Sequence, residues 1–305
     1  MDERKVIALG FFDGVHRGHG ALFKKAVERA AQLGCTPAAF TFDRAPKEAV
    51  SGIPLPLINS LADRKALIDR LYGIGRVIVE PFDAQMMTMH WEAFIETLLC
   101  GKHGAAHLVA GHDFRFGHKN EGNVEKLAEK CRRLSIGCDI VEAVTLDGVT
   151  CSSTHIRALL QRGDVRTAAR FLGHPHCLTQ TVAHGRRIGR TIGVPTVNLT
   201  IPEKVITPAF GVYAARVILP DGAVRGGVTN VGVRPTVSGS GVTVETFILD
   251  FDGDLYGEEI RVEFLEYLRA EQKFSSLDDL RAQIARDAER AKEIIDETEK
   301  DRCGN

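Results

Sequence analysis

The sequence predicts two domains of different class. We expect an α/β domain with a doubly wound parallel sheet, followed by an all-β domain that forms a small antiparallel β-barrel with a C-terminal helix. Up to about Leu172, short apolar segments alternate with helical patterns. After Leu172–His176, glycine, threonine and valine become frequent, and helical periodicity fades until near the end. We therefore expect domains at residues 1–172 and 173–305.

The expected strands of the first domain are short and mostly apolar, which is typical of a parallel sheet buried on both faces. They are Val6–Leu9, Ala38–Phe42, Val77–Val79, Leu108–Ala110 and Ile140–Val144. Between them, apolar periodicity predicts the helices His19–Leu33, Leu61–Leu71, Trp91–Leu99 and Val124–Leu134. In such sheets ligands bind beyond the carboxyl ends of the strands, where the strand order reverses.

The second domain shows several strands separated by turn signals. The expected strands are Thr179–Ala183, Gly211–Leu219, Val224–Val231, Val242–Leu249 and Glu259–Leu268, with a hairpin turn at Pro220-Asp221-Gly222. The last segment, Ser276–Glu299, predicts a helix with one apolar stripe, made of Leu277, Leu280, Ile284, Ala288, Ala291 and Ile295. We expect this stripe to cover one side of the barrel, and a partner-binding helix is the less favoured alternative.

Composition narrows the class of protein. The chain has 305 residues, 44% of them hydrophobic and 26% charged, with a formal net charge of −1. These values are ordinary for a globular protein, and they give no reason to expect nucleic acid or a membrane surface as a partner. The seven cysteines show no C-x-x-C spacing, which favours reduced thiols over a zinc site. The charged N-terminus enters a strand at once, so we expect a cytoplasmic protein without a secretory signal.

The segment around which the first domain is organised follows its first strand. The strand ends at Gly10, a Phe12-Asp13-Gly14 turn follows, and His16-Arg17-Gly18-His19 opens a helix. Helix N-termini attract phosphate, and two imidazoles three residues apart can donate hydrogen bonds to charge that grows on a phosphate. A short H-x-x-H can arise by chance, but the strand, turn and helix start together favour a nucleotide site.

Three further segments follow strands of the first domain. They are Thr41–Pro46, Gly111–Gly117 (GHDFRFG) and Cys151–Val165 (CSSTHIRALLQRGDV). Phe114 and Phe116 serve equally well as core residues of a turn. Ser152, Ser153 and Thr154 can cap the next helix, and the same groups with Arg157 suit phosphate oxygens, so capping and binding are compatible.

The second domain carries two segments with candidate functional residues. In HGRRIGRTIGVPTVNL, the glycines would let a loop fold over phosphates, and Thr196 and Asn198 offer oxygen ligands for Mg²⁺ on one face of a strand. Glu245 lies in the otherwise apolar strand VTVETFIL, where a carboxylate needs a partner or a role. An outward-facing glutamate on a half-exposed strand is the alternative.

The motifs GFFDGVHRGH, GHDFRFG, CSSTHIR and PTVN, in this order, resemble the bifunctional riboflavin kinase/FAD synthetase family over nearly the whole chain. The resemblance implies a nucleotidylyltransferase-like first domain that adenylates FMN to FAD, and a second domain that phosphorylates riboflavin to FMN. Both reactions would use Mg²⁺ and ATP. It implies that His16, His19 and Glu245 are catalytic, Glu245 being the general base, and that Thr196 and Asn198 bind metal. The implied nucleotide-binding residues are Gly10, Phe12, Asp13, Gly14, Asp113, Ser152, Ser153, Thr154, Arg157, Gly185, Gly189 and Gly193.

The sequence departs from the family pattern at Arg44, Ala45, Asn120 and Gln180. These departures leave three alternatives: a paralogue with a single activity, a flavin-binding regulator without catalysis, and a nucleotidylyltransferase for another small molecule. A regulator needs no general base, and another nucleotidylyltransferase would leave the second domain unexplained. We expect small-molecule substrates and infer no obligate protein partner.

Overall fold

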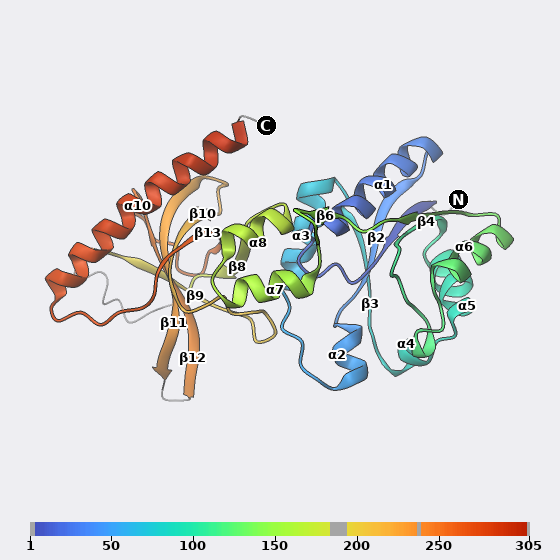
Figure 1. Cartoon of the computed structure of the whole chain (residues 1–305), viewed down its shortest axis with the longest axis horizontal. Helices are drawn as coiled ribbons and strands as arrows, with labels where there is room; N and C mark the ends of the chain where they lie inside the picture. Colours follow the sequence, from blue (N-terminus) through green and yellow to red (C-terminus); the bar gives the residue numbers. More distant parts are fainter. Residues whose placement is uncertain (1–3, 184–193, 237–238, 304–305) are drawn as a thin grey trace. The chain divides into compact units, whose positions relative to one another are not determined.

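Figure 1 shows the computed structural model of the chain, which describes residues 4–183, 194–236 and 239–303. By its internal contacts the chain divides into two compact units. The first contains the residues up to Leu57 together with Leu61–Ser153, and the second contains Ile58–Ser60 and the residues from Thr154 onward. No helix in these described ranges is long and apolar enough to cross a membrane.

The first unit is built on a five-stranded sheet with the order β3-β2-β1-β4-β5, in which every neighbouring pair is parallel. Its strands are β1 Lys5–Leu9, β2 Thr36–Phe42, β3 Arg76–Glu80, β4 Ala105–Gly111 and β5 Gly137–Val141. The chain moves outward from β1 through β2 to β3, then returns to the other side of β1. The strand order therefore reverses between β1 and β4, which confirms the doubly wound prediction.

Helices connect these strands, and a small hairpin of β6 Thr145–Leu146 and β7 Val149–Thr150 follows β5. The helices are α1 Arg17–Leu33, α2 Pro46–Ser51, α3 Leu61–Tyr72, α4 Ala84–Thr88, α5 Trp91–Ala93, η1 Phe94–Lys102, η2 His118–Asn120 and α6 Val124–Arg133. The prediction of one α-helix over Trp91–Leu99 is wrong in part, because η1 is a π-helix. Its wider turn keeps Phe94, Ile95, Leu98 and Leu99 buried together in the core.

The second unit holds a curled six-stranded antiparallel sheet with the order β8-β13-β10-β11-β12-β9. The strands are β8 His176–Thr181, β9 Thr196–Thr200, β10 Gly211–Ile218, β11 Val224–Thr236, β12 Gly239–Ile248 and β13 Glu259–Arg269. The two edges of the sheet approach each other, because the N–H of Ala183 donates to the carbonyl of Asn198 at 2.9 Å. This half-barrel confirms the predicted fold class.

Two strand predictions need adjustment. The first strand starts at His176 rather than Thr179, because His176, Cys177 and Leu178 are buried against β13. A further strand, β9, carries Thr196 and Asn198 and completes the sheet. The predicted hairpin turn at Pro220–Gly222 joins β10 to β11, where the N–H of Gly222 donates to Leu219.

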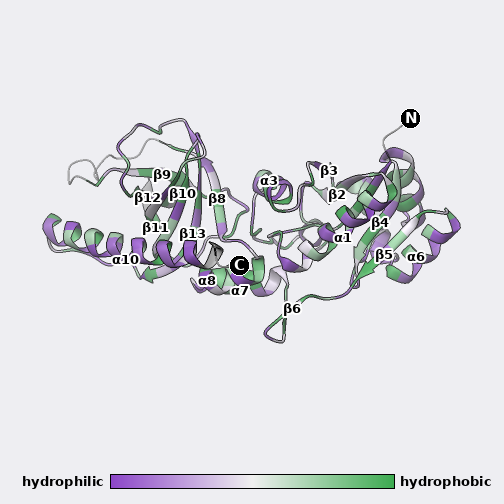
Figure 2. Cartoon of the chain, turned by 90° about the horizontal axis from the view of Figure 1, so that it is seen from above, coloured by the Kyte–Doolittle hydropathy of each residue, from purple (hydrophilic) through white to green (hydrophobic). Residues whose placement is uncertain are grey.

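Helices complete the second unit: α7 Ser153–Gln161, α8 Val165–Leu172 and α10 Leu277–Cys303. Figure 2 shows hydrophilic and hydrophobic residues alternating along α10. Its buried face packs on the sheet in one cluster, which includes Val212, Ala214, Val228, Leu265, Ala288, Ala291 and Ile294. The prediction that this helix covers one side of the barrel is therefore confirmed.

Candidate active sites

The turn after β1 holds three residues in the left-handed region. The φ angles are 59° at Phe12, 84° at Gly14 and 46° at Val15. Glycine adopts such angles freely, whereas a β-branched valine rarely does, and strain of this kind costs about 1–3 kcal/mol. Strained backbone persists where surrounding contacts hold it, and such places cluster at ligand sites.

His16 and His19 lie together at the start of α1. Their rings stack with centroids 3.6 Å apart and planes 19° apart. His16 is the N-cap residue, and its Nδ1 accepts a hydrogen bond from the N–H of His19 at 3.3 Å. The accepting role of Nδ1 places the proton of a neutral His16 on Nε2. The two histidines singled out in the sequence are thus adjacent, with His16 just outside the helix.

His19 is held in the neutral state. Its Nδ1 is buried without a hydrogen-bond partner, and the ring of Phe12 packs edge-on against it at 5.3 Å. Burial, and then the positive charges of His16 and Arg64, lower the pKa of His19 well below 6.5. A neutral imidazole still offers one N–H donor to a phosphate oxygen.

The other predicted residues of this turn mostly build it. Phe12 and Asp13 are buried, and a Cβ on Gly10 would lie 2.6 Å from the Phe12 ring. Ser153 donates from Oγ to the carbonyl of Asp13 at 2.9 Å, so its hydroxyl supports the turn. The backbone of the turn, more than these side chains, is what a nucleotide would meet.

A cavity of about 770 Å³ opens beyond the carboxyl ends of β2, β3 and β4. Its walls are largely aromatic and include Phe42, Phe82, Phe94, Phe114 and Phe116, with Met86 and Met87. Lys47, Arg115 and Lys119 add positive charge to the lining. An apolar wall with few charged groups suits a flat ring system that carries an anionic tail.

The cavity includes some of the residues predicted to line it. Phe114, Phe116 and Asn120 are in the lining, whereas Asp113 is exposed and outside it. Of the two departures in Thr41–Pro46, Arg44 is exposed and Ala45 is the buried N-cap residue of α2.

The residues after Ser153 lie in the second unit. Thr154 is exposed and Arg157 is half-buried, both on α7, and Ser152 precedes this helix as a half-buried residue of the first unit. Gly185, Gly189 and Gly193 lie outside the described residues. Gln180 lies in β8 opposite Ile260 and is half-buried.

Three polar side chains form a row across neighbouring strands of the half-barrel. Glu245 on β12 is the direct partner of Asn198 on β9 and of Asn230 on β11. Direct partners in an antiparallel pair place their side chains on the same face, with Cβ atoms about 5 Å apart. The candidate general base and one candidate metal ligand therefore lie side by side, as their predicted roles require.

Asn198 has an unused oxygen. The residue is 9% exposed, and its Oδ1 is buried without a hydrogen-bond partner. Thr196, two residues before it on the same strand, points to the same face of β9. A buried amide oxygen beside a hydroxyl is a donor set that suits a hard cation such as Mg²⁺.

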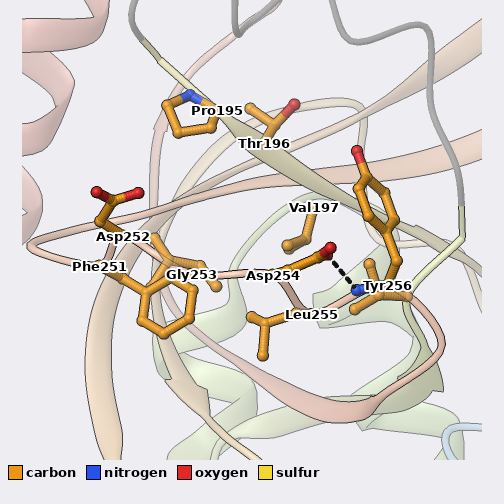
Figure 3. Close-up of a pocket in the computed structure, with 11 residues that line it drawn as sticks. Pro195, Thr196, Val197, Phe251, Asp252, Gly253, Asp254, Leu255 and Tyr256 are labelled. Atoms are coloured by element: carbon orange, nitrogen blue, oxygen red, sulfur yellow. Dashed lines mark hydrogen bonds between the residues drawn. The ribbon is translucent and has the colours of Figure 1, made fainter.

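Thr196 also lines a cavity of about 490 Å³, shown in Figure 3. The segment Phe251–Tyr256 forms the opposite wall, where the N–H of Tyr256 donates to Asp254 Oδ1 at 3.1 Å. The cavity is large enough to take part of a nucleotide or flavin.

Comparison with known proteins agrees with this pair of sites. A family model described as FAD synthetase matches residues 1–155, and one described as Riboflavin kinase matches residues 172–295. Proteins named bifunctional riboflavin kinase/FMN adenylyltransferase are 35% identical in Haemophilus influenzae, over 94% of this chain and 92% of that one. The Escherichia coli K12 relative is 36% identical over 95% and 92%. The chain belongs to the bifunctional riboflavin kinase/FMN adenylyltransferase family.

Membership confirms the predicted function and the order of its two modules, with FAD synthetase first and riboflavin kinase second. A crystal structure of a protein named as a macrolide-efflux protein from Streptococcus pneumoniae has the same fold. Its TM-score is 0.84 at 30% identity, over 96% of this chain and 95% of that one.

One residue beside the first site was missed by reasoning from sequence. Arg64 on α3 is fully buried next to the turn. The signal was present, because Arg64 lies three residues after Leu61 and three before Leu67, on the apolar side of its helix.

Proposed function

We propose that the first unit joins FMN to the adenylyl group of ATP at the turn after β1. A phosphate oxygen of FMN attacks the α-phosphorus, and pyrophosphate leaves. The reaction needs positioning and neutralisation of charge rather than a protein nucleophile. Neutral His16 and His19 donate hydrogen bonds to the α-phosphate and the leaving group. The stacked pair at the N-terminus of α1 is the observation that carries this proposal.

We propose that the FMN ring lies in the aromatic cavity of about 770 Å³. The lining of five phenylalanines supports stacking of a flat ring, and Lys47, Arg115 and Lys119 favour an anionic ligand. The backbone of Gly10–Gly14, with Ser152, Ser153, Thr154 and Arg157, would hold ATP. Asp113, exposed beside the cavity lining, keeps only the supporting role that the resemblance implies.

In the second unit, we propose that Glu245 accepts the proton of the riboflavin hydroxyl as its oxygen attacks the γ-phosphorus of ATP, releasing ADP. Thr196 and Asn198 would hold Mg²⁺, since the buried Oδ1 of Asn198 lacks a partner. When bound, the ion neutralises phosphate charge. The pairing of Asn198 with Glu245 carries this part of the proposal. Gly185, Gly189 and Gly193 would close over the phosphates.

We assign residues 1–172 to the adenylyl module and 173–305 to the kinase module. The match to the riboflavin kinase family starts at residue 172, which supports this division. The segment between the two matches, 156–171, holds Arg157, which we place with the ATP site. We further propose a cytoplasmic enzyme that acts on riboflavin, FMN and ATP without an obligate protein partner.

A time course tests the proposal. The purified chain is incubated with riboflavin, ATP and MgCl₂, and the flavins are separated by chromatography. We expect FMN first and FAD later. FMN alone would show that adenylyl transfer has been lost, and the departures at Arg44 and Ala45 would then be tested first. No turnover of riboflavin, with conversion of added FMN to FAD, would exclude the kinase role. Tight flavin binding with no product at all would support the regulator alternative.

A further inference from the structure

A fully buried arginine lies under the turn that carries the histidine pair. Arg64 is 0% exposed. Its Nη1 donates to the carbonyl of Phe11 at 2.6 Å and to Thr41 Oγ1 at 3.1 Å. Thr41 Oγ1 itself donates to the same carbonyl at 2.9 Å. The guanidinium also lies 4.3 Å from the centre of the Phe11 ring. Three contacts from α3 and β2 thus converge on the residue immediately before the strained turn.

The charge of Arg64 is only partly compensated. No hydrogen bond or ion pair joins it to a carboxylate within the described ranges, and its Nε and Nη2 have no partner there. Burial lowers the pKa of Arg64 to about 10, while the nearby charge of Asp13 opposes this shift. The guanidinium therefore stays protonated near neutral pH. An incompletely paired buried cation is costly, and an anionic ligand nearby would offset that cost.

We propose that Arg64 is a positioning residue for adenylyl transfer, holding the strained Phe11–Val15 turn by its first carbonyl and fixing a positive charge beside the His16–His19 pair. The inference rests on the placement of the reaction at this turn. Strain at Phe12 and Val15 persists only if neighbouring groups hold the backbone, and Arg64 and Ser153 hold it at two carbonyls, those of Phe11 and Asp13.

The same charge acts on the histidines. The groups that influence the titration of His19 are His16 on the same turn and Arg64 from α3, and Asp13 lies close enough to affect Arg64. Both cations favour the neutral form of His19. Removing Arg64 should therefore raise the pKa of His19, even though burial continues to lower it.

The test uses Arg64→Met and Arg64→Lys in the full chain, with Arg70→Met, an exposed position on the same helix, as the matched control. For Arg64→Met we expect kcat for FMN adenylylation to fall roughly 100-fold, as a displaced reacting geometry would cause. The acid limb of its pH profile should move to higher pH. Arg64→Lys keeps the charge but loses the planar fork, so it should be slower with the acid limb in place. Riboflavin phosphorylation should be unchanged in all three variants.

Folding of the first unit is checked separately by the emission and melting of Trp91, the single tryptophan of the chain. A folded Arg64→Met with wild-type kcat overturns the proposal. Equal loss of rate in Met and Lys variants with an unmoved acid limb overturns the role of the charge. If Arg64→Met does not fold, wild-type kcat in Arg64→Lys overturns the proposal, and a reduced kcat with an unmoved acid limb supports it. His19→Ala is the reference: if it still forms FAD, the placement of the reaction is wrong, independently of Arg64.

Discussion

Acid should destabilise the second unit through one buried histidine. His176 is 2% exposed, its ring stacks on Phe264 at 5.5 Å, and its Nδ1 has no partner. Burial, and then the charge of His174, lower its pKa from 6.5 to about 3. The unfolded chain therefore binds the proton first as the pH falls below 6.5. Stability is complete above that pH and decreases by about 1.4 kcal/mol per pH unit below it, or about 2 kcal/mol at pH 5.

His176→Phe keeps a ring against Phe264 and removes the titration. Between about pH 7.5 and pH 5, we expect wild type to lose about 2 kcal/mol more local stability than the variant. Amide hydrogen exchange of peptides from β10 and β13, corrected for the intrinsic rate at each pH, measures this free energy. Peptides from β1 and β4 in the first unit provide the internal reference, since the substitution should leave them unchanged. An equal fall in both proteins would refute the assignment of the proton to His176.

Three predictions concern function. Glu245→Gln should slow FMN formation by roughly 100-fold or more, yet leave FAD formation from added FMN intact, and loss of both would contradict independent modules. Asn198→Ala should raise the Mg²⁺ concentration needed for half-maximal FMN formation, and an unchanged requirement would place the ion elsewhere. Gly117→Ala should raise the KM for FMN in adenylylation, because φ is +74° and the new Cβ would lie 2.7 Å from Trp91 Cα, beside the cavity. Gly148→Ala is its matched control, with φ +76° and open space; a similar KM in both variants would exclude an effect on the cavity.

The general position of the first site could be predicted because it depends on local sequence. An apolar run predicts β1, and the glycine-rich turn with the following amphipathic pattern predicts where α1 begins. Parallel strands place their carboxyl ends at one edge, so the turn after β1 had to lie where the strand order reverses. The pairing of Asn198 with Glu245 could not be predicted in the same way, because register between distant strands is not encoded in either strand alone.

The contacts that hold the first turn were beyond reach for a similar reason. Arg64 lies far from Phe11 in sequence, and only the packing of α3 against β2 brings its guanidinium to that carbonyl. The π-helix η1 was missed because its buried residues, Phe94, Ile95, Leu98 and Leu99, also fit α-helical spacing.

The two sites depend on different physical constraints, and this sets which substitutions each will tolerate. The first depends on a strained backbone held at the carbonyls of Phe11 and Asp13, so loss of a distant buried donor should impair it. The second depends on strand register, because Asn198 and Glu245 share a face only while β9 and β12 keep their pairing. A shift of one residue in β9 would turn Asn198 to the opposite face and separate it from Glu245. Insertions in β9 should therefore abolish FMN formation more readily than substitutions on its opposite face, such as at Val197.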